Sequence, residues 1–245
     1  MDKLLYTAMS GAQHALMAQG IRANNLANAN TQGFRADYEQ ASAHTLNGDG
    51  FHTRVLAQSQ QAGSNLAAAP LQETGRELDI AIQGDGFIAL QSGQEGGQEG
   101  YTRAGNMLIS PDGELTINGH VVMGEGGPLQ LPEFSTLEIG ADGTISLTPP
   151  GGGAQVEGGR IKLVQPGQGE LQKGLDGLFY AVEPGALAQA EDVQLKQGHL
   201  EGANVNVVEE MVQNMALSRQ FELQVRAMKT ADDQARAGAR LIRGS

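Results

Sequence analysis

The residue types that support catalysis or metal binding occur here in few combinations. Five histidines are spread along 245 residues, no two of them lie three or four residues apart, and none has a carboxylate at ligand spacing. A zinc or iron site is therefore not predicted, because such sites collect several ligands at short spacings. The chain contains no cysteine, which excludes a disulfide framework and a thiolate nucleophile. It also lacks the nucleophile elbow, the Walker loop and the dinucleotide fingerprint, so we expect no catalytic residue, no metal and no cofactor.

Aspartates that precede glycine are the remaining candidates for a calcium site or for a pair of catalytic carboxylates. Four of them are considered as such candidates, namely Asp85, Asp112, Asp142 and Asp176. Asp-Gly is a preferred pair at the tip of a β-hairpin, where the aspartate tolerates the turn and bonds to its own backbone. The spacing of the four fits neither the EF-hand nor the nonapeptide calcium repeat. We interpret them as turn residues.

Charge is unevenly distributed along the chain. The formal net charge is -12, whereas residues 1–34 and residues 205–245 each carry +1, which leaves -14 on residues 35–204. An acidic surface of this kind repels phosphate groups, so binding to nucleic acid or to anionic membranes is not expected. The N-terminus lacks a basic leader followed by an apolar run, and no long apolar window occurs, so we expect neither a cleavable signal peptide nor membrane insertion.

Both ends of the chain carry apolar residues at the alternating three- and four-residue steps of a heptad repeat, which predicts two long helices. In the N-terminal segment, residues 1–35, the repeat is interrupted by Gln19 and its apolar members are Leu5, Met9, Ala12, Leu16, Ala23 and Leu26. In the C-terminal segment, residues 201–245, the members are Met211, Phe221, Val225, Met228, Ala235, Ala239 and Ile242. Helices of roughly 40 and 57 Å at the two ends of one chain are expected to pack as a coiled coil, with each other or with copies of themselves.

The middle of the chain changes to the two-residue period of β-strands. Residues 76–200 contain short apolar alternations separated by Asp-Gly, Pro-Asp-Gly and Asn-Gly turns, which predict an all-β meander of antiparallel hairpins. Residues 36–75 are predicted to be an extended connector, and residues 148–159 a surface loop. The expected fold is a mainly β central domain flanked by long N- and C-terminal α-helices.

One short stretch contains more asparagine than the end of a helix requires. Residues 24–35, NNLANANTQGFR, follow the first heptad helix and contain the Asn and Gly residues that terminate helices. The stretch resembles the N-terminal signature of bacterial flagellar rod and hook proteins, in which Asn-Asn-Leu-Ala-Asn, a Thr, and Gly-Phe with a basic residue close the first helix. The matching positions are Asn24, Asn25, Leu26, Ala27, Asn28, Thr31, Gly33, Phe34 and Arg35.

Other stretches resemble the same family, namely its first core hairpin, its next hairpin and its C-terminal helix, at residues 78–90, 101–124 and 200–242. Within the family, the segments YTAMSGA, LEGANVNVVEEMV and SRQFELQVRAMKTAD are most similar to the members that form the proximal rod. A distal rod protein or a short hook-type axial protein is the alternative within the family.

The resemblance implies a non-enzymatic subunit of the basal-body rod, the shaft that crosses the periplasm and links motor to hook. It implies helical assembly with copies of the chain and with neighbouring rod proteins, and export by the flagellar type III apparatus. It also implies that the terminal helices pack inside the assembly and that the β domain lies outside. The heptad residues named above and Phe34 are then expected at subunit contacts. The signature turn that ends the helix and faces another subunit comprises Asn24, Asn25, Asn28, Thr31, Gly33 and Arg35.

Two other classes of function fit the sequence less well. A periplasmic wall-modifying enzyme that rides on the rod needs an acid and a base in one groove, and the sequence offers no such pair. A free-standing β-domain adhesin has no need of heptad repeats at both ends.

Overall fold

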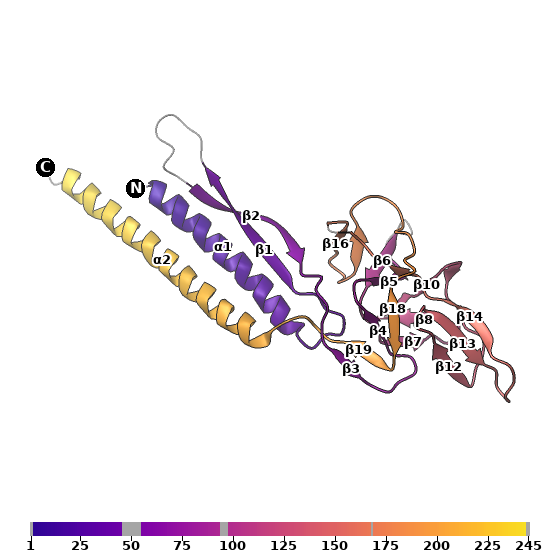
Figure 1. The fold of residues 1–245 in the computed structure, drawn as a ribbon. Helices are drawn as coiled ribbons and strands as arrows, with labels where there is room; N and C mark the ends of the chain where they lie inside the picture. The colour runs from indigo at the N-terminus through magenta and orange to yellow at the C-terminus, as the bar shows by residue number, and fades with distance from the viewer. Residues whose placement is uncertain (1, 46–54, 94–97, 168, 244–245) are drawn as a thin grey trace. The chain divides into compact units, whose positions relative to one another are not determined.

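The computed structural model describes the backbone of residues 2–45, 55–93, 98–167 and 169–243, and the side chains of residues 5–39, 63–93, 98–167 and 169–240 (Figure 1). The chain divides into two compact units. The helical unit comprises residues 1–28, 37–65 and 205–245, and the β unit comprises residues 29–36 and 66–204. Each unit is therefore built from segments that are distant in sequence.

Two long helices form most of the helical unit. They are α1 (Asp2–Ala27) and α2 (Val207–Arg243), which lie side by side in antiparallel directions (Figure 1). Asn206 caps α2, because its side-chain oxygen accepts the backbone N–H of Glu209 at 3.3 Å. Glu209 and Glu210 add negative charge in the first turn, where the helix dipole favours it.

The N-terminal helix ends at the asparagines of the signature stretch. The carbonyl of Asn24 accepts both the backbone N–H of Asn28, at 3.1 Å, and the side-chain amide of Asn28, at 3.0 Å. The side-chain bond adds to the last backbone bond of the helix, so Asn28 contributes two donors at the helix end. The expected helix stop therefore lies where the sequence places it.

A β-hairpin completes the helical unit. Its strands β1 (Asp37–Thr45) and β2 (Val55–Ser64) pair antiparallel, with an irregularity after Tyr38, and both pack against α1. Residues 36–75 are predicted to be an extended connector. The structure instead has two paired strands in this range. A Cβ at Gly63 would lie 2.9 Å from the Tyr38 ring, so the glycine lets the aromatic side chain cross the partner strand. Polar, weakly alternating strands of this kind are hard to recognise from their sequence.

In its described residues, the β unit contains seventeen short strands. In chain order they are β3 (Leu71–Glu73), β4 (Ile80–Gln83), β5 (Phe87–Gln91), β6 (Glu99–Thr102), β7 (Met107–Ile109), β8 (Leu115–Ile117), β9 (His120–Val121), β10 (Met123–Gly124), β11 (Gly127–Pro128), β12 (Thr136–Ile139), β13 (Thr144–Thr148), β14 (Val156–Arg160), β15 (Leu163–Val164), β16 (Leu171–Lys173), β17 (Phe179–Ala181), β18 (Gln194–Gln197) and β19 (His199–Glu201).

These strands form several small sheets. The largest has the order β15-β5-β6-β17-β16, two others have the orders β12-β13-β14 and β7-β8-β9, and β18-β4, β19-β3 and β10-β11 are two-stranded. The mainly β centre is confirmed, but the sheets are not a simple meander. In particular, the expected hairpin at residues 78–90 is wrong, because β4 pairs with β18 and β5 pairs with β6 and β15. Residues 156–159 of the expected loop belong to β14, which continues to Arg160.

The predicted turns explain the hairpins that do form. Gly113, Gly143 and Gly177 each follow the aspartate of an Asp-Gly pair and have φ of 80°, 86° and 83°. Asn118 and Gly119, between β8 and β9, have φ of 51° and 85°, as a tight hairpin turn requires.

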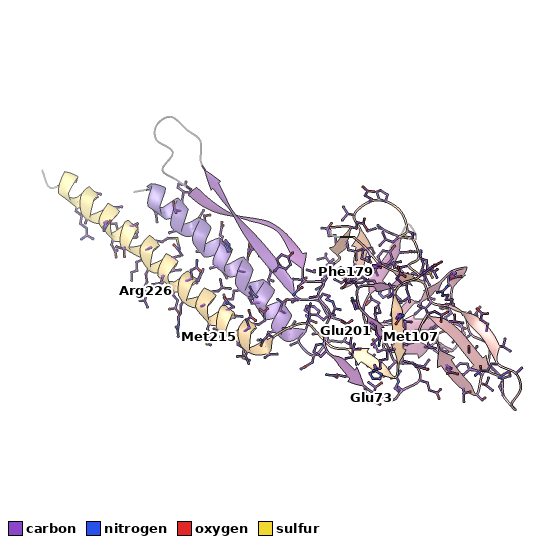
Figure 2. All side chains as sticks on the ribbon, in the orientation of Figure 1. Glu73, Met107, Phe179, Glu201, Met215 and Arg226 are labelled. Carbon is purple, nitrogen blue, oxygen red and sulfur yellow. The ribbon has the colours of Figure 1, made fainter. Side chains whose placement is uncertain are left out.

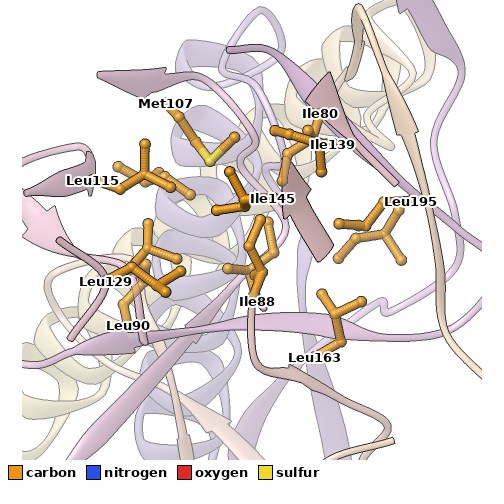
Figure 3. Packing of buried hydrophobic residues seen from close by; sticks show 14 of the residues in the cluster. Ile80, Ile88, Leu90, Met107, Leu115, Leu129, Ile139, Ile145, Leu163 and Leu195 are labelled. Atoms are coloured by element: carbon orange, nitrogen blue, oxygen red, sulfur yellow. The ribbon is translucent and has the colours of Figure 1, made fainter. Parts of the chain in front are cut away.

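Two apolar clusters hold the β unit together. The larger includes Ile80, Ile88, Met107 and Leu115 and draws on most of the sheets (Figure 3). The smaller is formed by Phe87, Ala89, Tyr101, Val164 and Phe179. Strand β5 belongs to both, because its alternate side chains point to opposite faces of the sheet. Neither helix, over the part of the chain that the structure describes, carries an apolar run long enough to span a membrane.

Replacing Leu115 by Ala should lower the free energy of unfolding of the β unit by about 2–5 kcal/mol, because a buried leucine leaves a cavity in the larger cluster. Leu108, on the paired strand β7, is exposed and is the matched control. Its replacement by Ala should change the free energy by about 0.5 kcal/mol or less. Urea denaturation followed by circular dichroism measures both values, and equal losses would contradict the assigned core.

Candidate assembly surface

One side of α2 packs against α1 through a regular seam. The seam positions of α2 follow alternating four- and three-residue steps, and none is exposed: Glu210, Asn214, Leu217, Phe221, Gln224, Met228, Ala231, Ala235 and Gly238. On α1, which α2 and the hairpin both cover, the same steps connect Ala8, Ala12, Ala15, Gln19, Arg22 and Leu26. Small and polar residues occupy many of these positions.

Polar pairs cross the seam where the two helices meet. The side-chain amide of Gln19 donates to the Asn214 side chain at 3.1 Å. Arg22 donates to the Glu210 carboxylate at 2.9 Å, and the Glu210 side chain is only 8% exposed. Charge-assisted bonds to a partly buried carboxylate are stronger than those on an open surface. These pairs fix the register of α1 against α2.

Asn25 connects three elements of the helical unit. Its side chain is buried, and its amide nitrogen donates to the Asp37 carbonyl at 2.8 Å and to Glu210 at 3.2 Å. Its amide oxygen accepts the Asp37 N–H at 2.9 Å. One signature side chain thereby joins the end of α1 to the starts of β1 and α2.

The structure places half of the expected heptad positions in the seam and the other half beside it. Leu5, Ala12 and Leu26 on α1, and Phe221, Met228 and Ala235 on α2, are buried or partly buried. The remaining positions are exposed, namely Met9, Leu16, Ala23, Met211, Val225 and Ala239. The side chain of Ile242 lies outside the described residues. The exposed positions differ from the seam because the predicted repeat follows large apolar residues, whereas the seam uses Ala8, Ala15, Glu210 and Gln224, each one position earlier.

A second apolar surface therefore remains on the helices. On α2, Val208, Met211, Val212 and Met215 lie at positions i, i+3, i+4 and i+7, which share one face of a helix, and are between 49% and 71% exposed. Met215 is labelled on α2 in Figure 2. We call these four residues the exposed stripe. On α1, Tyr6, Met9, Leu16 and Met17 are also exposed. Exposed apolar patches of this kind mark interaction sites on soluble proteins.

The last part of the signature stretch belongs to the β unit. Gly33 has φ of 67°, and a Cβ there would lie 2.2 Å from the backbone nitrogen of Ala104. Its N–H donates to the Glu201 carbonyl at 2.8 Å. Only glycine can occupy this position, because both the backbone conformation and the close approach exclude a side chain.

Arg35 ends the stretch in a buried ion cluster centred on Glu201, which closes β19 (Figure 2). Arg35 donates to one carboxylate oxygen at 2.6 Å, and Arg103 donates to the other at 2.8 Å. The first oxygen also accepts the Ala69 N–H at 2.8 Å. All three charged side chains are at most 1% exposed. Burial lowers the pKa of Arg35 from its usual value, and the Glu201 carboxylate opposes that shift.

Neighbouring contacts hold the two arginines and the turn in place. Arg103 also donates to the Gly84 carbonyl at 2.6 Å and lies over the Phe87 ring, 5.7 Å from its centroid. The ammonium of Lys173 lies 4.0 Å from the centroid of the half-buried Phe34 and donates to the Arg35 carbonyl at 3.0 Å. These cation–π contacts add to the anchoring of the turn.

Asn204 clamps the chain on the other side of the same turn. Its side-chain oxygen accepts the Ala36 N–H at 2.8 Å, its side-chain nitrogen donates to the Ala67 carbonyl at 2.9 Å, and its backbone N–H donates to the Phe34 carbonyl at 3.3 Å. The turn is therefore held by more hydrogen bonds than the end of a helix alone would require. Of the other signature residues, Asn24 and Thr31 are exposed, and Asn28 is partly buried.

Sequence reasoning missed the partners of the signature residues. Glu201, Arg103, Asn204 and Glu210 lie far from residues 24–35 in the sequence, and nothing in their local spacing marks them. Glu201, Asn204 and Glu210 do fall within LEGANVNVVEEMV, and Arg103 falls within residues 101–124, stretches that the resemblance singled out without a role for these side chains. Among the described residues, no three His, Asp or Glu side chains are grouped so that they could hold a metal ion.

Comparison with known proteins points to one family over the whole chain. Residues 5–35 match the family described as flagella basal body rod protein, residues 81–147 the flagellar hook protein FlgE/F/G D1 domain, and residues 196–241 the flagellar basal body rod FlgEFG protein C-terminal family. The chain is 41% identical to the flagellar basal-body rod protein FlgF of Salmonella typhimurium, with 95% of each chain covered. It is 40% identical to FlgF of Escherichia coli, with 99% of each covered. Its identity to the rod protein FlgG of Bacillus subtilis is 27%, over 95% of this chain and 96% of the relative.

Replacing Glu201 by Gln should destabilise the β unit by about 3–5 kcal/mol, because two buried guanidinium groups lose their counter-charge. Glu125 is the control, since it pairs with Arg160 at 3.2 Å on the surface. Its replacement by Gln should cost about 1 kcal/mol or less. Hydrogen exchange of the β-unit amides measures both effects. Equal protection in the two variants would show that the buried cluster does not anchor the turn.

Proposed function

The chain belongs to the family of flagellar basal-body rod proteins, and we propose that it is a structural subunit of the proximal rod of the bacterial flagellum. In this role it assembles with copies of itself and with neighbouring rod proteins into the shaft that links motor to hook. The identity of 40–41% to two FlgF proteins over nearly the whole chain supports the proximal position. The lower identity to FlgG makes a distal rod or hook-type role the less favoured alternative.

The geometric observation that supports assembly is the exposed stripe. Val208, Met211, Val212 and Met215 together form an apolar surface on α2 that α1 does not cover. Burying such side chains against another subunit removes apolar area from water, which is the main driving force for association. The helices thus have one side that packs in the seam and a second, apolar side that is free to contact a neighbour.

The seam supports a closer description of the helix pair. Alternating steps of three and four residues on both helices are the spacing of a coiled coil. We therefore infer that α1 and α2 pack as an antiparallel coiled coil, with Gln19–Asn214 and Arg22–Glu210 as the polar pairs that specify its register. Polar residues at such positions select one register at some cost in stability.

The proposed role is mechanical and not catalytic, and its site is the basal body. Delivery would use the flagellar type III export apparatus, as the resemblance implies. The contacts that such a subunit needs are those between subunits, which include the exposed members of the expected packing set. Helical assembly requires that two different surfaces of the chain meet, because a contact that does not close into a ring propagates.

Replacing Leu16 or Met211 by Asp should abolish rod assembly and swimming while leaving the monomer folded, because both side chains are exposed in the helical unit. Gln213→Asp is the control, since Gln213 is an exposed polar residue on another side of α2. The variants are expressed in the bacterium of origin without its own copy, and swimming rings and isolated basal bodies are compared. Normal rods in the Leu16 and Met211 variants would contradict the proposed packing.

A further inference from the structure

Glu39 is a buried carboxylate of the helical unit that lacks a hydrogen-bond donor. Its side chain, on β1, is only 6% exposed. Among the described residues, neither of its oxygens accepts a hydrogen bond. A carboxylate that stays charged and unpaired away from water is costly. Such a group stays buried at lower cost when it binds a proton or pairs with a cation.

His14 is the group that can supply this charge. Its Nδ1 lies 3.9 Å from Oε2 of Glu39, so the pair joins the middle of α1 to the start of β1. The distance is that of an ion pair and is longer than a hydrogen bond. The imidazole is 23% exposed and can exchange a proton with water, whereas the carboxylate is shielded. Histidine changes its charge near neutral pH, so the charge of this pair depends on pH.

The other described titratable groups of these elements are exposed or already bonded. On α1 and β1 they are Tyr6, Arg22, Asp37 and Tyr38. Arg22 pairs with Glu210 at 2.9 Å, Asp37 accepts the Ser64 hydroxyl at 2.6 Å, and both tyrosines are exposed. Strand β2 has no titratable residue, and the other described charged residues of α2 are exposed. The side chains of Asp2, Lys3 and His44 lie outside the described residues.

We propose that the β1–β2 hairpin closes on α1 with uptake of one proton, held between His14 and Glu39, and loosens as the pH rises. The closed form holds the proton on the imidazole, as an ion pair, or on the carboxylate, as a neutral group. In the open form both side chains are in water, where imidazole gives up its proton above about pH 6.5 and glutamate above about pH 4.3. The open form therefore holds no proton at pH 8, and raising the pH above this range of imidazole favours opening by up to about tenfold per pH unit.

Contact with α1 decides whether the two strands of the hairpin stay paired. Among the described strands, β1 and β2 pair only with each other, and both pack against α1. A two-stranded hairpin alone is marginally stable in water. When the hairpin leaves α1, the backbone bonds between its strands are therefore expected to open as well. The hairpin is a pH-dependent cover of one side of α1, and this property belongs to the single chain, whatever the chain assembles with.

Hydrogen exchange of the purified full chain tests the proposal. The amides of residues 41–44 and 56–59, which are paired across the hairpin, are compared at pH 6 and pH 8. Protection factors are used, because they remove the intrinsic effect of pH on exchange, and the amides of β5 in the β unit serve as the reference. Relative to β5, the protection of the hairpin should fall about tenfold between pH 6 and pH 8.

Substitutions of the two members test the pair itself. Glu39→Gln removes the buried charge, so the protection of the hairpin should be the same at pH 6 and pH 8. His14→Gln removes the cation, so the protection at pH 6 should fall about tenfold. His44→Gln replaces a second histidine on β1 as the matched control and should leave the pH dependence unchanged. Unaltered protection of β5 verifies that each variant is folded.

Equal protection at pH 6 and pH 8 in the unsubstituted chain would overturn the proposal, as would an unchanged pH dependence in Glu39→Gln. A pH dependence that is lost in His44→Gln and kept in His14→Gln would assign the proton to another histidine and overturn the proposal as well. None of these outcomes touches the proposed function, which is decided separately by whether the chain restores rods.

Discussion

The carboxylate of Glu201 binds two buried guanidinium groups, that of Arg35 in the signature turn and that of Arg103. The other features of the turn follow from this contact. Gly33 must be glycine because the chain passes against the backbone at Ala104, and its N–H bonds to the carbonyl of Glu201 itself. A lone buried carboxylate or guanidinium is costly, so each member of the cluster requires the others. Residues 29–36 are thereby fixed in the β unit although they follow directly on the first helix.

In the helical unit, the buried side chain that connects several elements is uncharged. The amide of Asn25 satisfies the first backbone groups of β1 and reaches Glu210 at the start of α2. The signature stretch thus divides its side chains between two compact units, with Asn25 in one and Arg35 in the other. The stretch ends a helix, and it also holds the chain at two places, through Asn25 in the helical unit and through Arg35 in the β unit.

Short-range features of this fold could be predicted from the sequence, and long-range ones could not. The turns at Asp112-Gly113 and Asp142-Gly143 lie at hairpin tips because Asp-Gly determines local backbone geometry. The pairing of β4 with β18 joins residues more than a hundred positions apart, and no local pattern specifies it. Several expected seam positions lie one residue beyond the observed ones, because Ala15 and Gln224 do not look like core residues. Glu201 was missed because its role depends entirely on distant arginines.

Oxidation of exposed methionines, read by mass spectrometry, tests the central claim most directly. Met9, Met17, Met211 and Met215 are exposed on the helices, and Met107 is buried in the β unit and serves as the internal reference. The account predicts that the four helical methionines oxidise readily in the monomer and become protected in isolated basal bodies, while Met107 is protected in both. Equal oxidation of the four in monomer and basal body would contradict the assignment of these surfaces to contacts between subunits.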